Sequence, residues 1–236
     1  MRGREPHRGS FSNVSLNEEQ TVDSRLDPKP SSSLDDNLLV RELTHRIINE
    51  FASMIGLVSL AATRSTGDDV TNALEGVKAL LHNHACLYHA LQMPTYTTVI
   101  DASDYVRVLC QSIKRAKLDD RNIELTLVEH PVKMRSERCW RLGMIVSELI
   151  ANSARHAFDD QGGAIRIELS ASGPIAQCQV TDNGSSSGAV QSDDGLKIVE
   201  ELVRKLDGEI VHRFEIDGAT SVLIFPIDDD PSSVNP

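Results

Sequence analysis

The chain has 236 residues, enough for one or two domains with a substantial core. Its 24 basic and 35 acidic residues give a net charge of −11, which argues against a general nucleic-acid binder, since such proteins need clustered positive charge. The four cysteines lie far apart with no Cys-x-x-Cys pair, so neither a zinc site nor a disulfide framework is expected.

The two ends of the chain are polar. Residues 1–34 are rich in Ser, Arg, Asp and Pro without an apolar period, which predicts a disordered arm, and residues 228–236 form a short acidic tail. The N-terminus lacks the apolar run of a signal peptide, and no stretch approaches the roughly 18 apolar residues that span a membrane. We therefore expect a cytoplasmic protein with no membrane partner.

Residues 36–64 are predicted to form one long helix. Apolar side chains recur along it at three- and four-residue steps and make one stripe, formed by Val40, Leu43, Ile47, Phe51, Met54, Val58 and Ala61. His45 lies about 160° from the centre of this stripe on a helical projection, so it is expected to face solvent. Glu42 and Asn49 lie beside it at i−3 and i+4.

A turn at 65–69 leads into a second helix with the same kind of apolar spacing, from Val70 to Leu91. His84 and His89 flank its stripe and are interpreted as interface or satisfied core residues. The two helices form a hairpin, residues 35–94, with more apolar surface than it can bury alone. The simplest arrangement is a four-helix bundle made by two chains, that is, a homodimer.

After Pro94 the pattern becomes mixed. Helices are predicted over 102–116, capped by Asp101, over 137–158 and over 194–206, which stops at Gly208. Strands are predicted over 122–128, 163–170, 175–182, 209–215 and 220–225. Helices gathered on one face of a mostly antiparallel sheet make an α/β sandwich, so the fold class is α+β.

Polar residues line one face of the helix 137–158. Glu148, Asn152 and His156 stand at i, i+4 and i+8, and oxygen ligands of these types suit Mg²⁺. Arg155 could meet a phosphate group. The same spacing is also expected of a solvated helix face, and spacing alone does not separate the two readings.

The segment Val-Thr-Asp-Asn-Gly ends the predicted strand 175–182. Asp182 could accept a hydrogen bond from an exocyclic amine such as that of adenine, and Gly184 permits close backbone approach, although Asn-Gly is also an ordinary turn. Residues 185–194 are small and polar, as expected of a mobile lid or of a plain loop. Gly195 opens a helix whose N-terminal amides could hold phosphate oxygens, or it is simply a helix start. The chain has no P-loop motif.

Taken in order, these segments resemble the HWE and closely related HisKA-type sensor histidine kinases over about 38–227. ELTHRIINEF resembles the phosphoacceptor box, and ALLHNHACLY the second-helix signature. SELIANSARHAF resembles the N-box, VTDNG and DGLKIVEELVRKLDGEI the two glycine boxes, and GATSVLIFP the closing strand.

The resemblance implies a two-component kinase that uses ATP to phosphorylate His45 and then passes the phosphoryl group to an aspartate of a response regulator receiver domain. Glu42 would be the neighbouring acid that assists proton removal, and Arg46 and Asn49 would complete the box. Input would come from a separate sensor protein, from the arm or from dimer geometry.

The resemblance also implies a Bergerat-type ATP-binding domain over 95–227. Asn152 would hold Mg²⁺, with Glu148 nearby. The remaining assignments are Arg155, His156 and Gly195 toward the phosphates, and Asp182, Gly184 and Thr220 around adenine.

Two departures from the family pattern leave other functions open. Ser186 stands where the first glycine box usually has a second glycine, and the Trp-x-Glu element is absent, since the only tryptophan, Trp140, precedes the N-box. The alternatives are a histidine phosphotransferase with a decayed ATP site, which relays phosphate between response regulators, and a non-catalytic module that sequesters a regulator.

Overall fold

The computed structural model describes residues 32–96, 98–158, 162–185 and 194–228. The predicted arm lies outside these ranges except for its last three residues, 32–34, which already belong to the first helix. The predicted tail also lies outside them beyond Asp228. Within the part of the chain that the structure describes, every helix is too short or too polar to span a bilayer.

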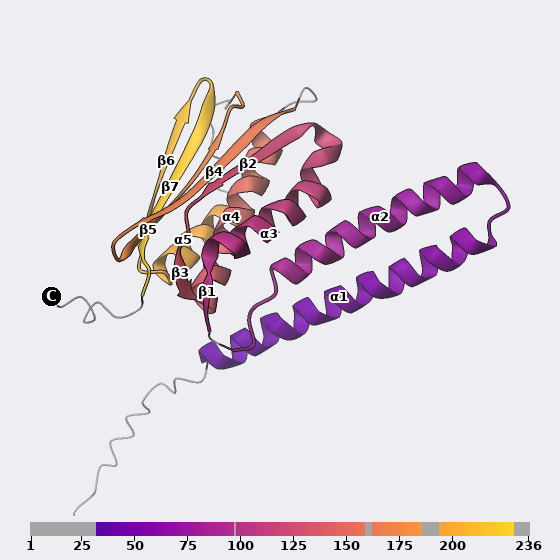
Figure 1. The fold of residues 1–236 in the computed structure, drawn as a ribbon, viewed down its shortest axis with the longest axis horizontal. Helices are drawn as coiled ribbons and strands as arrows, with labels where there is room; N and C mark the ends of the chain where they lie inside the picture. The colour runs from indigo at the N-terminus through magenta and orange to yellow at the C-terminus, as the bar shows by residue number, and fades with distance from the viewer. Residues whose placement is uncertain (1–31, 97, 159–161, 186–193, 229–236) are drawn as a thin grey trace, which may run out of the picture.

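Two antiparallel helices, α1 (Ser32–Arg64) and α2 (Asp68–Ala90), form the predicted hairpin (Figure 1). Aromatic rings pack between them: the Phe51 ring lies 6.1 Å from that of His84 and 5.5 Å from that of Tyr88, between centroids. His84 is therefore a packing residue, one of the two roles expected for it, whereas His89 is exposed. These ring contacts between Phe51, His84 and Tyr88 fix the register of the two helices.

The predicted apolar stripe of α1 is only partly covered by α2. Phe51 and Val58 are partly buried. The apolar side chains that remain exposed in a single chain include Val40, Leu43, Ile47, Met54 and Leu57 on α1 and Val70, Val77 and Leu80 on α2. The hairpin thus has an apolar face, made by these eight residues, that the described residues of the same chain leave open to solvent.

The second part of the chain contains a five-stranded sheet with the order β2-β4-β5-β7-β6. The strands are β2 (Ile123–Glu129), β4 (Gly163–Ser172), β5 (Ile175–Asp182), β6 (Glu209–Glu215) and β7 (Gly218–Pro226). Only the β2-β4 pair is parallel. Helices α3 (Ala102–Ile113), α4 (Ser136–His156) and α5 (Asp194–Arg204) cover one face (Figure 1). The predicted α+β sandwich is confirmed.

Two features of this domain differ from the prediction. The helix expected over 102–116 ends as an α-helix at Ile113 and continues as a π-helical turn, Lys114–Leu118. A second, two-stranded sheet pairs β1 (Val99–Asp101) with β3 (Lys133–Arg135), and strands of three residues are too short to show a period in sequence. The predicted cap is confirmed, since Asp101 accepts a hydrogen bond from the Ser103 amide at 2.9 Å.

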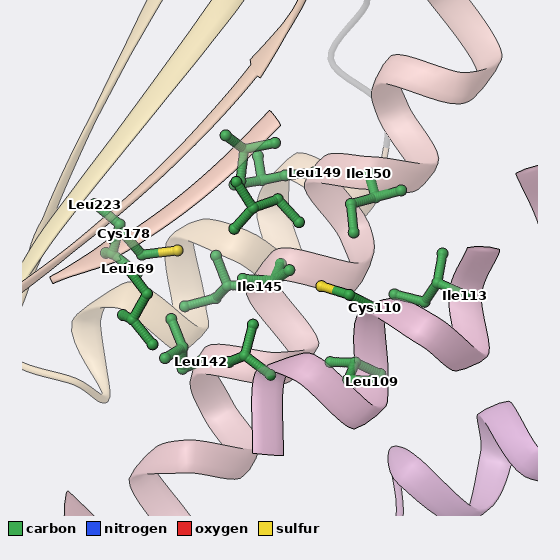
Figure 2. Packing of buried hydrophobic residues seen from close by; sticks show 14 of the residues in the cluster. Leu109, Cys110, Ile113, Leu142, Ile145, Leu149, Ile150, Leu169, Cys178 and Leu223 are labelled. Carbon is green, nitrogen blue, oxygen red and sulfur yellow. The ribbon is translucent and has the colours of Figure 1, made fainter. Parts of the chain in front are cut away.

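The core lies between the sheet and its helices and is mainly aliphatic. Figure 2 shows side chains of α3 and α4, such as Leu109 and Ile145, packed toward Leu169 and Leu223 of the sheet. All four cysteines are free, as expected. Burial raises the pKa of the Cys110, Cys139 and Cys178 thiols to about 12, so these three cysteines are unreactive core residues.

A buried arginine ties three elements of the sheet domain together. Arg138, in the first turn of α4, is fully buried, and its Nη2 donates to the carbonyl oxygens of Leu206 at 2.7 Å and Pro226 at 2.5 Å. The Leu206 carbonyl lies just after α5 and the Pro226 carbonyl lies at the end of β7. One guanidinium therefore provides hydrogen-bond donors to backbone carbonyls at the ends of both elements. Nothing in the spacing of the sequence pointed to this role.

The hairpin is joined to the sheet domain by specific hydrogen bonds. The Trp140 indole of α4 donates to the carbonyl oxygen of Leu91, just after α2, at 2.8 Å. The side-chain amide of Asn83, on α2, donates to the Arg115 carbonyl at 3.2 Å. The backbone amide of Ser136 donates to the Thr98 carbonyl at 2.7 Å. The exit of the hairpin is therefore bonded to the beginning of α4.

Candidate functional site

The site begins with His45, which is exposed on α1 as the helical projection predicted. Its Nδ1 atom lies 3.2 Å from the amide nitrogen of Asn49, one turn further along the helix. Asn49 Nδ2 donates to Nδ1 when that ring nitrogen carries no proton, and with the amide turned the Asn49 oxygen accepts from an Nδ1–H. Asn49 thus orients the imidazole through Nδ1 and leaves Nε2 free of this contact.

The acidic neighbour of His45 is engaged by an arginine. Arg46 Nε donates to Glu42 Oε1 at 2.9 Å, and this hydrogen bond holds the pKa of the Glu42 carboxyl below its ordinary value. Both side chains are more than half exposed, so the pair is screened by solvent. The structure brings Glu42, His45, Arg46 and Asn49 together on one face, as predicted, with Glu42 hydrogen-bonded to Arg46.

The second part of the site centres on Asp182, at the end of β5. The residue is only 5% exposed, and three donors hold its carboxylate. Ser153 Oγ of α4 donates to Oδ2 at 2.6 Å, and the amides of Gly184 and Ala219 each donate to Oδ1 at 3.2 Å. Because α4, β5 and β7 all contribute, the carboxylate is fixed in position as a hydrogen-bond acceptor.

Gly184 permits the close backbone approach that the sequence predicted. A Cβ atom on Gly184 would lie 2.1 Å from the Ala157 carbonyl oxygen, at the end of α4. Any other residue would push the end of α4 away from the end of β5. The glycine therefore keeps Ser153 within reach of Asp182.

Two small hollows adjoin beside α4. The larger hollow, about 330 Å³ with the open solvent at its mouth included, has Asn152, Ser153, Asp182, Leu196, His212, Phe214, Ala219 and Ser221 in its lining. The smaller hollow, about 190 Å³ with open solvent included, is lined by Glu148, Asn152, Arg155, Gly195, Leu196 and Val199. Asn152 and Leu196 belong to both, so the two hollows are parts of one site.

The smaller hollow brings together four residues that the sequence singled out. Glu148, Asn152, Arg155 and Gly195 all line it, and a Cβ on Gly195 would lie 2.9 Å from Glu148 Oε2. The amide and carboxylate oxygens are hard donors of the kind that Mg²⁺ takes alongside water and phosphate oxygens. Among the described residues, no group of three or more His, Cys, Asp or Glu side chains is placed to hold a metal ion.

Two predicted residues lie elsewhere. Thr220 is paired with Thr181 across β5 and β7, with their hydroxyl oxygens 3.2 Å apart. Because side chains alternate along a strand, this pair lies on the opposite face of the sheet from Asp182. The expectation that Thr220 supports Asp182 is therefore corrected: Ala219 and Ser221 face the hollow instead. His156, the last residue of α4, is exposed and lines neither hollow.

The sequence did not point to Ser153, His212, Phe214 or Ser221. Ser221 could have been found from strand alternation once Ala219 was placed opposite Asp182. His212 and Phe214 lie in β6, which reaches the site only because of the strand order β5-β7-β6. The departure at Ser186 and most of the predicted lid, 185–194, lie outside the described residues.

Comparisons with known proteins agree with these features. Residues 42–117 match the family model HisKA_2, described as histidine kinase. The sensor histidine kinase PdtaS of Mycolicibacterium smegmatis is 26% identical over 197 residues, covering 80% of this chain and 39% of that protein. Blue-light-activated histidine kinase 2 of Erythrobacter litoralis is 25% identical over 202 residues, covering 78% of this chain and 55% of that protein. The chain thus spans less than two thirds of either relative.

Solved structures share the fold at low identity. The histidine kinase domain of Erythrobacter litoralis EL346 superposes with a TM-score of 0.52 at 18% identity, covering 76% of this chain and 96% of that one. A bacterial phosphotransferase gives a TM-score of 0.57 at 13% identity, covering 83% and 98%. Together with the family match, these findings confirm the predicted resemblance to sensor histidine kinases and the predicted arrangement of a helical hairpin before a sheet domain.

Proposed function

We propose that this chain is an ATP-dependent protein-histidine kinase of two-component signalling. It transfers the γ-phosphoryl group of ATP to His45 and then to an aspartate of a response regulator receiver domain. The observation that carries the proposal is the pairing of an exposed histidine on the hairpin with a fixed carboxylate, Asp182, beside oxygen donors on the sheet domain.

The two hollows match the two ends of a nucleotide. Asp182 would accept a hydrogen bond from the exocyclic amine of adenine in the larger hollow, while Gly184 lets the end of α4 lie close to Asp182. Asn152 and Glu148 would hold Mg²⁺ in the smaller hollow, where the ion would neutralise phosphate charge. Arg155 and the backbone at Gly195 would approach the phosphates, and His156 would need to turn toward them from its exposed position.

His45 has the chemistry of a nucleophile in this transfer. A neutral imidazole carries one nitrogen lone pair that can act as a nucleophile. With the Asn49 amide turned so that its oxygen accepts from Nδ1–H, that lone pair is on Nε2, which would attack the γ-phosphorus. The Nε2–P bond forms as the bond from phosphorus to the bridging oxygen breaks, and ADP leaves. Glu42 would take up the Nδ1 proton, directly or through water, once released from Arg46.

The exposed apolar face of the hairpin supports a homodimer. The eight apolar side chains of this face are among those of α1 and α2 that are open to solvent in one chain, and a second copy of the hairpin would cover them in a four-helix bundle. His45 lies about 160° from the centre of the predicted stripe and would stay accessible in such a bundle. An accessible histidine can meet both the nucleotide and the receiver domain.

The test is incubation of the purified chain with γ-labelled ATP and Mg²⁺. Wild type should acquire label that is lost in acid and kept in base, and His45→Ala and Asn152→Ala should not. His89→Ala, which removes another exposed histidine of the hairpin, is the matched control and should label normally.

Two results would count against the proposal. Label that survives in His45→Ala would place the phosphoryl group elsewhere. No label from ATP, together with His45-dependent exchange with phosphorylated receiver domains, would replace the kinase by the phosphotransferase alternative.

A further inference from the structure

The floor of the larger hollow is made by two rungs of side chains across three neighbouring strands. In the first rung, Asp182 of β5 pairs with Ala219 of β7, which pairs with Phe214 of β6. In the second rung, Val180 pairs with Ser221, which pairs with His212. Since residues that pair directly share a sheet face, all six point toward the helices.

The rungs form a trough. Strand β7, which lies between β5 and β6, supplies the small side chains Ala219 and Ser221. Strands β5 and β6 supply larger side chains on either side. Neighbouring strands lie about 4.8 Å apart, so the two walls stand roughly 10 Å apart at the backbone. Such a width admits one flat ring system in contact with a wall, and Leu196 of α5 lines the trough as well.

One wall of the trough is aromatic. The rings of His212 and Phe214 lie 6.3 Å apart between centroids, with 24° between their planes. Ser221 fixes the imidazole, because its Oγ lies 2.7 Å from His212 Nδ1. Phe214 is 44% exposed although it lines a hollow, so a good part of its ring is available for contact with a bound molecule.

We infer that His212 and Phe214 are specificity-determining residues of the nucleotide site, forming a wall against which a planar base packs, opposite the Asp182 carboxylate. The ligand class is a nucleotide whose base carries an exocyclic amine, with its phosphates in the smaller hollow beyond Asn152. This inference rests on the proposed function, and it names the surface that holds the base rather than the phosphates.

The inference separates base binding from phosphate binding, and the test uses that separation. Binding of Mg·ATP and of Mg·tripolyphosphate, which has no base, would be measured by calorimetry. Phe214→Ala and His212→Ala should each weaken ATP binding on the order of tenfold, as expected for loss of one base–aromatic contact. Neither substitution should change tripolyphosphate binding.

Two further variants sharpen the result. His212→Phe keeps an aromatic wall without the Ser221 contact and should bind ATP within about threefold of wild type, about 0.7 kcal/mol at tenfold per 1.4 kcal/mol. Val211→Ala changes an exposed residue of the same strand that points to the other sheet face, and it should leave ATP binding unchanged.

The possible outcomes distinguish the aromatic wall of His212 and Phe214 from the proposed kinase function. Wild type that binds ATP, with Phe214→Ala and His212→Ala variants of equal affinity, overturns the aromatic wall and leaves the kinase proposal standing. Equal weakening of ATP and tripolyphosphate overturns it as well, since the residues would then act on the fold. Wild type that does not bind ATP overturns both.

Discussion

Replacing Ser153 by alanine tests how the site holds its carboxylate. The hydroxyl donates to Asp182 Oδ2 at 2.6 Å between two residues that are 8% and 5% exposed. A buried hydrogen bond to a charged group contributes about 1.5–3 kcal/mol to the free energy of unfolding. Loss of the donor leaves the buried acceptor without a hydrogen-bond partner, which costs free energy because the acceptor is also shielded from water. Because the amides of Gly184 and Ala219 still hold Oδ1, we expect a loss near or just below the lower end of that range, about 1–2 kcal/mol.

Urea unfolding, followed by circular dichroism, measures this loss. With a slope of about 2 kcal/mol per molar urea, the midpoint should fall by roughly 0.5–1 M. Ser147→Ala is the matched control, since Ser147 lies in the same helix and is also 8% exposed. A Ser153→Ala midpoint equal to that of the control would refute the view that this hydroxyl supports Asp182.

Three further predictions concern other parts of the molecule. Arg138→Met should lower the free energy of unfolding by about 2–4 kcal/mol, because two carbonyls lose their hydrogen-bond donor even though a buried charge is also removed. Calorimetry should show no such loss for Arg166→Met, which changes an exposed arginine. Burial lowers the pKa of His212, opposed by Glu200. The unfolded chain therefore binds a proton first, and stability should fall as pH drops below about 6.5 and level off below the folded pKa, a step absent in His212→Phe. Leu43→Asp should convert the proposed dimer to monomer in light scattering, and an unchanged dimer mass would exclude this face as the interface.

The sequence was most informative where one property repeats along one element. The exposure of His45 followed from helical spacing alone, and the close approach at Gly184 followed from a glycine at a strand end. Thr220 was misplaced because a one-residue shift in a strand moves a side chain to the other face, and only pairing with β5 settles the face.

His212 and Arg138 were out of reach for a related reason. Their partners, Ser221 and the carbonyls of Leu206 and Pro226, lie on elements whose neighbours depend on strand order and helix packing. Local spacing carries no information about such contacts. Long-range topology therefore determined the parts of the site that the sequence left unassigned.

Helix α4 contacts the exit of the hairpin near its beginning and lines the candidate site near its end. Trp140 in its second turn is bonded to Leu91, and Asn152 and Ser153 in its last turns line the hollows. The distance along the helix from Trp140 to Asn152 is about 18 Å, spanned by continuous α-helix. A displacement of the end of α2 must either break the indole hydrogen bond or carry α4 with it. A change in the hairpin that leaves this bond intact is therefore expected to reach the proposed nucleotide site as a shift of Asn152 relative to the sheet.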